Sequence, residues 1–182
     1  MSDLFSILSD LEKDENIHLG RLLILINVFG NENGLGEIEG LTKLAKLDFL
    51  LRYPVYLEKA LNESGKGMKK AEPKDYERQS VEAKMVRFKY GPWDFRYRRF
   101  INILIGKKLV YMRPQGRAYF LGITDEGRKA SNELERDSNF EDLVTRAKAI
   151  KTHFNLSGTW LMRFVYKTFP EIISLQYGRE IL

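Results

Sequence analysis

The spacing of apolar positions along the first part of the chain is mostly helical. Residues 4–11 repeat apolar side chains every three or four positions, which predicts a short amphipathic helix. Residues 18–29 are apolar nearly all round, which is typical of a helix buried on most faces, and we interpret them as the central helix of the core. Asn27 is the lone polar side chain deep in this run, so we expect it to have a hydrogen-bond partner.

A glycine-rich loop then leads into two further helices. Residues 41–54 place leucines on one side and end at Pro54, because the residue before a proline is disfavoured in helical geometry. We expect Lys43 and Lys46 on the polar side of this helix. Residues 55–61 predict a short third helix.

A polar stretch comes next, followed by a segment with the pattern of a strand. Residues 62–79 contain no Leu, Ile, Val, Phe or Trp, so they cannot contribute much to a core and predict a mobile polar insertion. Residues 80–90 alternate at Val86, Phe88 and Tyr90, which favours an extended segment.

A fourth helix and a hairpin follow. Asp94 is a good N-cap and Gly106 a good C-terminal stop. Arg96 and Arg99 fall on the polar face. Four apolar side chains share the opposite face: Tyr97, Phe100, Ile101 and Leu104. Two short apolar runs then flank the turn sequence "RPQG" at 113–116, which predicts a β-hairpin.

Helical patterns return in the last third of the chain. Thr124 is a candidate cap for one helix, and Ser138 with Glu141 has the spacing of a capping box for the next. Residues 157–169 form a last amphipathic pattern that stops at Pro170.

This order of elements predicts a mainly α protein with a small β-hairpin, built as a winged helix-turn-helix core with additional N- and C-terminal helices. In a winged helix, one helix enters the DNA major groove while the hairpin contacts the neighbouring backbone. We expect residues 1–136 to form this domain, with the polar insertion at 62–79, and residues 137–182 to form a C-terminal helical extension.

Composition narrows the class of protein. The 182 residues are 43% hydrophobic, enough for a core, and the absence of cysteine excludes disulfides and thiolate metal sites. The N-terminus is acidic where a signal peptide would be basic, and the longest apolar run, residues 22–30, is too short to span a bilayer. We therefore expect a soluble, cytoplasmic protein with no membrane contact.

The motifs of common enzymes are missing from the sequence. It contains no GxxxxGK[ST], GxSxG or HExxH pattern. His18 and His153 are far apart and lack ligand spacing, so we interpret both as structural or surface residues. We expect no catalytic residues, no metal site and no cofactor.

Positive charge favours an anionic partner. The net charge is +5, and the middle of the chain holds most of the excess. Arginine and lysine side chains there can reach phosphate oxygens, although ordinary solvated surface is a competing interpretation, and the dipole of the fourth helix accounts equally well for the two lysines at its end. The candidate DNA-binding residues are Lys43, Lys46, Arg96, Arg98, Arg99, Lys107, Lys108, Arg113 and Arg117.

Aromatic residues suggest a protein interface. The candidates are Tyr90, Trp93, Trp160, Phe164 and Phe169. Tyr90 and Trp93 suit core or interface anchors better than base-stacking groups, because a nucleic-acid platform usually lies on an exposed sheet. The alternative for Trp160 is packing on the winged-helix body.

Two stretches resemble a known family. "GLTKLAKLDFLLRYPVYLEKAL" and "MVRFKYGPWDFRYRRFINILIGKKLV" are similar to the middle component of the ABC-three-component bacterial defence systems, the group that includes Lamassu. With the hairpin and "ITDEG", the resemblance covers residues 18–135. Its most specific parts are Leu-Arg-Tyr-Pro at 51–54 and Tyr-Gly-Pro-Trp-Asp at 90–94.

The resemblance implies a non-catalytic winged-helix adaptor in an anti-phage defence complex. Its partners would be an SMC-like ABC ATPase, an effector that is often a nuclease, and double-stranded DNA contacted without sequence specificity. The alternative is a stand-alone winged-helix transcriptional regulator. That function needs a helix that reads bases, and residues 55–61 offer little to read them with.

Overall fold

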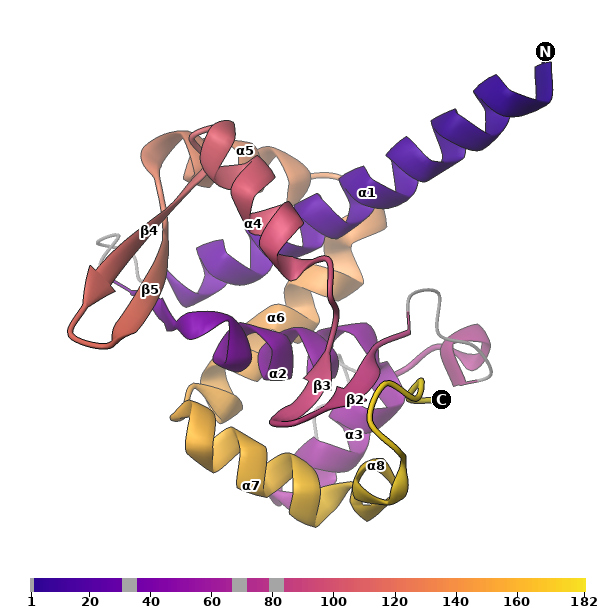
Figure 1. Ribbon diagram of the computed structural model, residues 1–182, viewed down its shortest axis with the longest axis vertical. Coiled ribbons are helices and arrows are strands. Elements are labelled where there is room, and N and C mark those ends of the chain that lie inside the picture. The colour runs from indigo at the N-terminus through magenta and orange to yellow at the C-terminus, as the bar shows by residue number, and fades with distance from the viewer. Residues whose placement is uncertain (1, 31–35, 67–71, 79–83) are drawn as a thin grey trace.

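The computed structural model describes residues 2–30, 36–66, 72–78 and 84–182, with the backbone alone for residues 2–14 (Figure 1). The helices are α1 (Ser2–Phe29), α2 (Gly40–Arg52), α3 (Pro54–Glu63), α4 (Tyr97–Gly106), α5 (Asp125–Leu134), α6 (Glu141–Phe154), α7 (Gly158–Thr168) and α8 (Pro170–Ser174). The 3-10 helices are η2 (Asp75–Arg78) and η3 (Ser138–Phe140). The strands are β1 (Ile38–Glu39), β2 (Val86–Phe88), β3 (Gly91–Trp93), β4 (Val110–Gln115) and β5 (Ala118–Ile123). The fold is therefore mainly helical with small antiparallel sheets, as expected.

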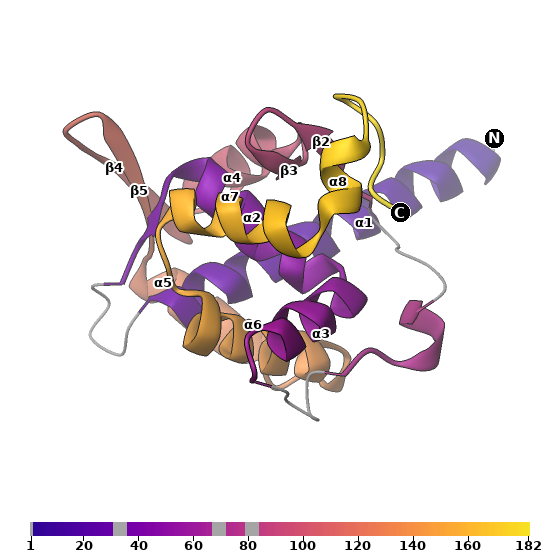
Figure 2. The same ribbon diagram turned by 90° about the horizontal axis from the view of Figure 1, so that it is seen from below.

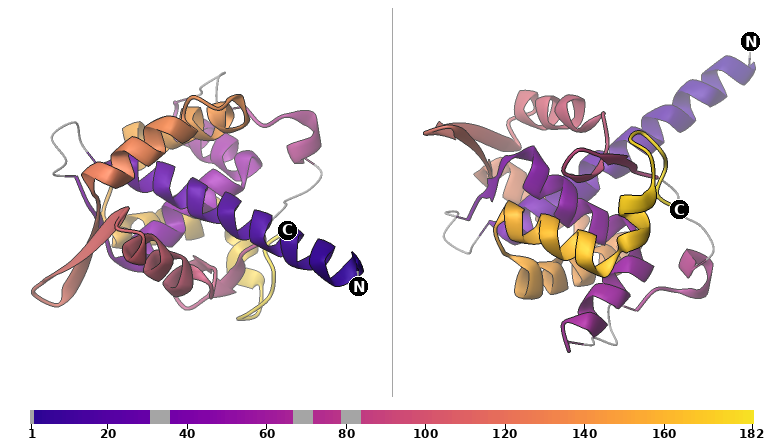
Figure 3. Two further views of the ribbon diagram at one scale, coloured as in Figure 1. Left: turned by 90° about the horizontal axis from the view of Figure 1, so that it is seen from above. Right: turned by 60° about the horizontal axis from the view of Figure 1, so that its bottom comes forward.

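The first helix is longer than expected. The short helix at 4–11 and the apolar helix at 18–29 are one continuous α1. Residues 12–16 are polar but contain no glycine or proline, so nothing interrupts the helix between the two apolar stretches. The N-terminal half of α1 extends away from the rest of the molecule (Figures 1 and 3).

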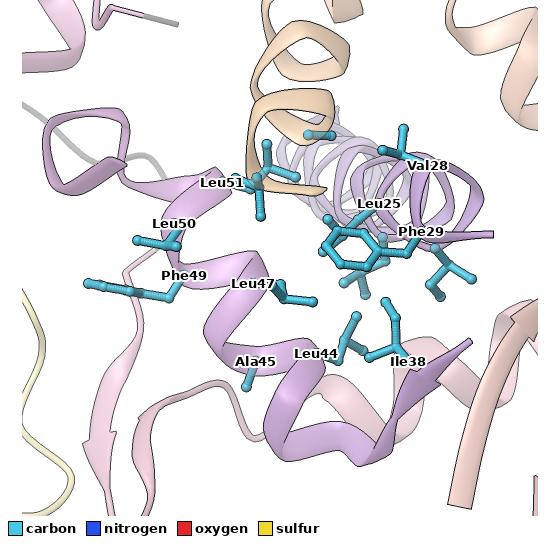
Figure 4. Close-up of a cluster of buried hydrophobic side chains, with 14 of the residues drawn as sticks. Leu25, Val28, Phe29, Ile38, Leu44, Ala45, Leu47, Phe49, Leu50 and Leu51 are labelled. Atoms are coloured by element: carbon cyan, nitrogen blue, oxygen red, sulfur yellow. The ribbon is translucent and has the colours of Figure 1, made fainter. Parts of the chain in front are cut away.

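The centre of the fold is shared by α2 and the C-terminal half of α1. Every residue of α2 from Lys43 to Arg52 is buried, because α1, α6, α7 and β3 surround it (Figure 2). The interface between α1 and α2 is a layer of aliphatic and aromatic side chains, among them Leu25, Phe29 and Leu47 (Figure 4). Asn27 has the partner expected of a buried amide, donating to Glu135 at 3.2 Å.

The larger sheet contains the expected hairpin. Its strand order is β1-β5-β4, with β4 and β5 joined by a tight turn. The pair Gln115–Ala118 closes the ladder, so the turn is Gly116–Arg117 rather than 113–116. Gly116 has φ +61°, a left-handed conformation that glycine adopts without steric cost, and this fixes where the turn falls.

A second, two-stranded sheet is formed by β2 and β3, with Val86 opposite Trp93. Residues 86–88 are thus extended, as their alternating pattern predicted. The C-terminal segment lies beside β2, where the Arg87 amide donates to the Arg179 carbonyl at 2.9 Å and the Ile181 amide to the Met85 carbonyl at 2.9 Å. Residues near 86 and near 180, far apart in sequence, therefore stabilise each other.

Part of the expected polar insertion is anchored by ion pairs. Residues 67–71 and 79 lie outside the described residues, but η2 is held between two helices. Glu77 accepts from the buried guanidinium of Arg146 on α6 at 2.6 and 2.7 Å. Arg78 donates two hydrogen bonds to Glu58 on α3. Residues 72–78 therefore join α3 to α6 by charge pairing, although η2 itself contributes no buried side chain.

The helix ends in the last third follow the sequence signals in part. Thr124 caps α5 as expected, accepting from the Gly127 amide at 2.9 Å. The capping box at Ser138 is wrong: Asp137 caps η3, and α6 begins at Glu141 without a side-chain cap. The helix at 158–168 stops before Pro170, which in turn begins α8.

The C-terminal helices share the core of the N-terminal part. Phe154, Leu161 and Phe169 are fully buried and belong to the same cluster as the apolar residues of α1 and α2. Residues on both sides of position 136 thus enclose α2.

Candidate nucleic-acid interface

The amphipathic helix α4 is the structural basis of the candidate interface. Its apolar face is buried as predicted, with Tyr97, Phe100, Ile101 and Leu104 all against the core. The helix begins after a turn in which Asp94 accepts from the Arg96 amide at 2.9 Å. Arg98, Arg99 and Asn102 lie on the outer face and are exposed to solvent.

The three arginines near the start of α4 have different surroundings. The guanidinium of Arg96 donates twice to Asp94, at 2.9 and 3.1 Å. Arg99 is paired with Glu15 of α1 at 2.9 Å. Arg98 is exposed and forms no ion pair within the residues that the structure describes. Of the three, Arg98 presents its charge most openly to a ligand.

The C-terminal end of α4 presents two lysines. Lys107 and Lys108 are exposed, and neither has an ion-pair partner in the described part of the chain. Lys108 has φ +59°, and the amides of Lys108 and Leu109 donate back to Ile105 and Leu104 to close the helix. A left-handed lysine is unusual, since glycine normally takes this position in the closing motif.

One of the two arginines of the hairpin forms an ion pair, and the other is exposed without being drawn into that pair. Arg113 on β4 forms a bidentate pair with Glu37, and its guanidinium lies 5.1 Å from the centre of the Phe120 ring. Hydrogen bonding to Arg113 lowers the pKa of the Glu37 carboxyl, although burial opposes this shift. Arg117 at the turn is exposed. Of the two hairpin candidates, Arg113 thus already has a carboxylate partner, whereas Arg117 is exposed at the turn.

A buried charge network fixes α4 against α1 and α2. The Asp48 carboxylate, which is fully buried, accepts from Arg21 at 2.7 Å, from Arg52 at 2.8 Å and from the Tyr97 hydroxyl at 2.7 Å. Arg52 also donates to Asp94 at 2.8 Å. The network thus ties the first residues of α4 to both central helices.

The network also sets the protonation of its members. Burial alone would raise the pKa of Asp48, but Arg21 and Arg52 outweigh burial and hold it at about 2. Burial, followed by the charges of Arg21 and Arg52, lowers the pKa of His18 to about 4, so His18 is neutral beside the Arg21 guanidinium. Sequence reasoning missed this network. Its signals were Arg21, the one charged side chain of the apolar run 18–29, and Asp48, the one acidic residue of α2.

Two of the expected DNA-binding residues are buried. Lys43 and Lys46 do not lie on a solvated side of α2, because α7 and the β2–β3 ribbon cover it. Lys43 donates to Asn155 at 3.2 Å, and Lys46 donates to the Thr42 carbonyl at 2.9 Å. Burial lowers the pKa of Lys46 to about 8.

The aromatic candidates separate into surface and core. Phe169 is fully buried against Phe49 and Tyr56, which corrects its assignment to a partner interface. Trp160 is 43% exposed and stacks on the half-buried Phe164, with ring centres 5.0 Å apart. Tyr90 is 49% exposed, and Trp93 is half-buried with its edge against Tyr97.

Several of the exposed cations belong to three neighbouring elements, the hairpin, α4 and the β2–β3 ribbon. These elements are aligned on one side of the molecule in both views of Figure 3. From the hairpin tip to the ribbon, the row contains Arg117, Lys108, Lys107, Arg98 and Lys89. Positive charges spaced over several elements are suited to an extended polyanion rather than to a small anion.

Metal-binding groups and membrane-spanning helices are both lacking in the described residues. Among them no three potential metal-binding side chains are grouped, and no helix is both long and apolar enough to cross a membrane. No family model, curated protein or solved structure matches the chain.

Proposed function

We propose that the protein is a non-catalytic adaptor that holds double-stranded DNA by its backbone, through α4 and the β4–β5 hairpin. The observation that carries the proposal is the row of exposed cations on these elements, namely Arg98, Lys107, Lys108 and Arg117. Contacts of this kind neutralise phosphates and carry no sequence information, so the binding would be non-specific.

A winged-helix arrangement is part of the same proposal. The chain order α1, β1, α2, α4, β4, β5 and the sheet order β1-β5-β4 support it, with α3 and the β2–β3 ribbon inserted before α4. In this arrangement α4, which leads directly into the hairpin, takes the place of the groove helix instead of residues 55–61. Its outer face offers Arg98 and Asn102 to the DNA.

The adaptor role rests on the resemblance to the middle component of Lamassu-type defence systems. An SMC-like ABC ATPase and an effector, often a nuclease, would be the protein partners. The stacked pair Trp160–Phe164 on α7 supports a protein contact, because exposed aromatic side chains are enriched at such interfaces. The fully buried Asp48 and its arginines support a structural rather than a catalytic role for the internal charges.

Titration with duplexes of unrelated sequence tests DNA binding. We expect similar affinities that fall steeply as the salt concentration rises. The slope of the logarithm of the binding constant against the logarithm of the salt concentration should become shallower by about 0.9 for each phosphate that a variant no longer neutralises. Replacing Arg98, Lys107, Lys108 and Arg117 by alanine together should weaken binding, whereas Arg113→Ala should have a smaller effect because Glu37 already pairs with it. Lys167→Ala on α7 is the control for removing an exposed positive charge elsewhere. Duplex affinity that survives the fourfold replacement would refute the proposed interface.

Isolation of the native protein from its host tests the adaptor role. Recovery of a large coiled-coil ATPase is expected. If the protein is instead recovered only with itself and one promoter sequence, the chain is a transcriptional regulator and the adaptor proposal fails.

A further inference from the structure

The β2–β3 ribbon carries a cluster of exposed aromatic rings that duplex binding does not explain. Phe88 is 40% exposed, Tyr90 49% and Phe95 65%. The Phe88 ring lies edge-on to Phe95 with centres 5.6 Å apart, and is stacked with half-buried Trp93 at 6.3 Å. We refer to these four residues, Phe88, Tyr90, Trp93 and Phe95, as the aromatic ribbon.

The charge around the aromatic ribbon is positive. The Lys89 ammonium lies 5.4 Å from the centre of the Tyr90 ring, and Arg98 is exposed in the first turn of α4. Asp94 is the one acidic residue between positions 84 and 98, and its carboxylate already accepts from Arg52 and Arg96. Glu180, which lies opposite Val86, is paired with Lys84. Neither carboxylate is thus left to neutralise Lys89, and the electrostatic complement of this surface is an anionic ligand.

We propose that the aromatic ribbon binds single-stranded DNA, with bases stacked on the exposed rings and phosphates near Lys89 and Arg98. Aromatic rings on a small exposed sheet, interspersed with cations, match the two chemical parts of an unpaired strand. A duplex cannot use the rings, because its bases are stacked on each other. An acidic peptide would use the cations but leave most of the exposed ring area uncovered.

This inference goes beyond the proposed function and does not depend on it. The ribbon is at the opposite end of α4 from the hairpin, on the same side of the molecule (Figures 1 and 3). The two elements could therefore bind different parts of one DNA molecule, but each can be tested alone.

Tryptophan fluorescence gives a direct readout, because the chain has two tryptophans. In the Trp160→Phe protein, emission comes from Trp93 in the ribbon. We expect an oligothymidylate to quench this emission, and Tyr90→Ala or Phe95→Ala to weaken its binding by about fivefold or more. Tyr90→Phe should keep the affinity, since stacking does not need the hydroxyl. Tyr76→Ala, which removes a 62% exposed ring from η2, is the matched control and should change nothing.

Three results would overturn the inference. They are the absence of quenching at concentrations where duplex binds, quenching that Tyr90→Ala and Phe95→Ala leave unchanged, and equally strong quenching by polyglutamate, which would identify an acidic peptide as the ligand. Circular dichroism of each variant establishes that it is folded. A fourfold Arg98, Lys107, Lys108 and Arg117 variant that keeps duplex binding would instead contradict the proposed function and leave the ribbon's quenching assay to decide this inference.

Discussion

Replacing Asp48 by asparagine keeps the shape of the side chain but removes the negative charge that accepts hydrogen bonds from three donors. The carboxylate lies 2.7–2.8 Å from Arg21, Arg52 and the Tyr97 hydroxyl, and none of it is exposed. Removing one partner of a buried ion pair typically costs about 3–5 kcal/mol of folding free energy, because the remaining charges stay buried without compensation. We expect a loss in this range at pH 7.

The pKa of Asp48 gives an independent figure of the same order. Burial opposes ionisation, but Arg21 and Arg52 lower the pKa from 3.8 to about 2. A difference of that size corresponds to about 2 kcal/mol of stabilisation of the folded state. Because the folded pKa is the lower one, this stabilisation is complete above the unfolded value of 3.8 and is lost as the pH falls towards about 2.

Urea unfolding followed by circular dichroism measures the effect. With a slope of about 2 kcal/mol per molar urea, the midpoint of Asp48→Asn should fall by about 2 M. Lys84→Ala is the control, because the Lys84–Glu180 pair is exposed and should contribute about 1 kcal/mol or less. If Asp48→Asn shifts the midpoint no more than Lys84→Ala does, the network does not hold α4 in place and the reasoning fails.

Three further predictions concern single residues. Burial and Arg21 lower the pKa of His18 from 6.5 to about 4, so the free energy of unfolding should fall by about 3 kcal/mol as the pH drops from 6.5 to 4. His18→Gln should flatten the dependence of the urea midpoint on pH. Parallel pH curves for the variant and the unaltered protein would contradict the assignment. Burial disfavours the charged form of Lys46, so Lys46→Met should raise stability at pH 7 by about 1–3 kcal/mol with no change in duplex affinity; a weakened affinity would mean that this ammonium reaches DNA after all. A Cβ on Gly127 would lie 1.8 Å from the Leu109 carbonyl oxygen, so Gly127→Ala should lower the free energy of unfolding by about 3 kcal/mol or more, measured as a lower melting temperature. A Cβ on Gly106 meets nothing within 4 Å, so Gly106→Ala should instead raise it by up to about 1 kcal/mol.

The sequence predicted those parts of the fold that depend on local pattern. The apolar face of α4 follows from the spacing of Tyr97, Phe100 and Leu104, and the hairpin follows from two apolar runs around a glycine turn. The turn was predicted about two residues too early in the chain. Its position is set by Gly116, which takes the positive φ, and not by Pro114.

The parts that sequence could not supply depend on neighbours from distant positions. The pattern of α2 alone places Lys43 and Lys46 on its polar face. In the fold they are buried, because α7 and the β2–β3 ribbon cover that face. The pairing of Arg113 with Glu37 could not be predicted either, because the two residues are 76 positions apart in the chain. The solvent exposure of a residue thus depends on the whole fold. A binding site made of exposed charges can therefore be predicted from sequence only when the packing around those charges is also predicted.

The central position of α2 has a consequence for how the protein is made. Residues 40–52 leave the ribosome early, but α6 and α7, which cover them, follow about one hundred residues later. At ordinary rates of synthesis, about 5–20 residues per second, the apolar surface of α2 stays exposed for several seconds before α6 and α7 are made. During that interval we expect chaperones to bind the nascent chain. Substitutions that slow the docking of α6 or α7 should therefore reduce the yield of soluble protein before they reduce the stability of the finished fold.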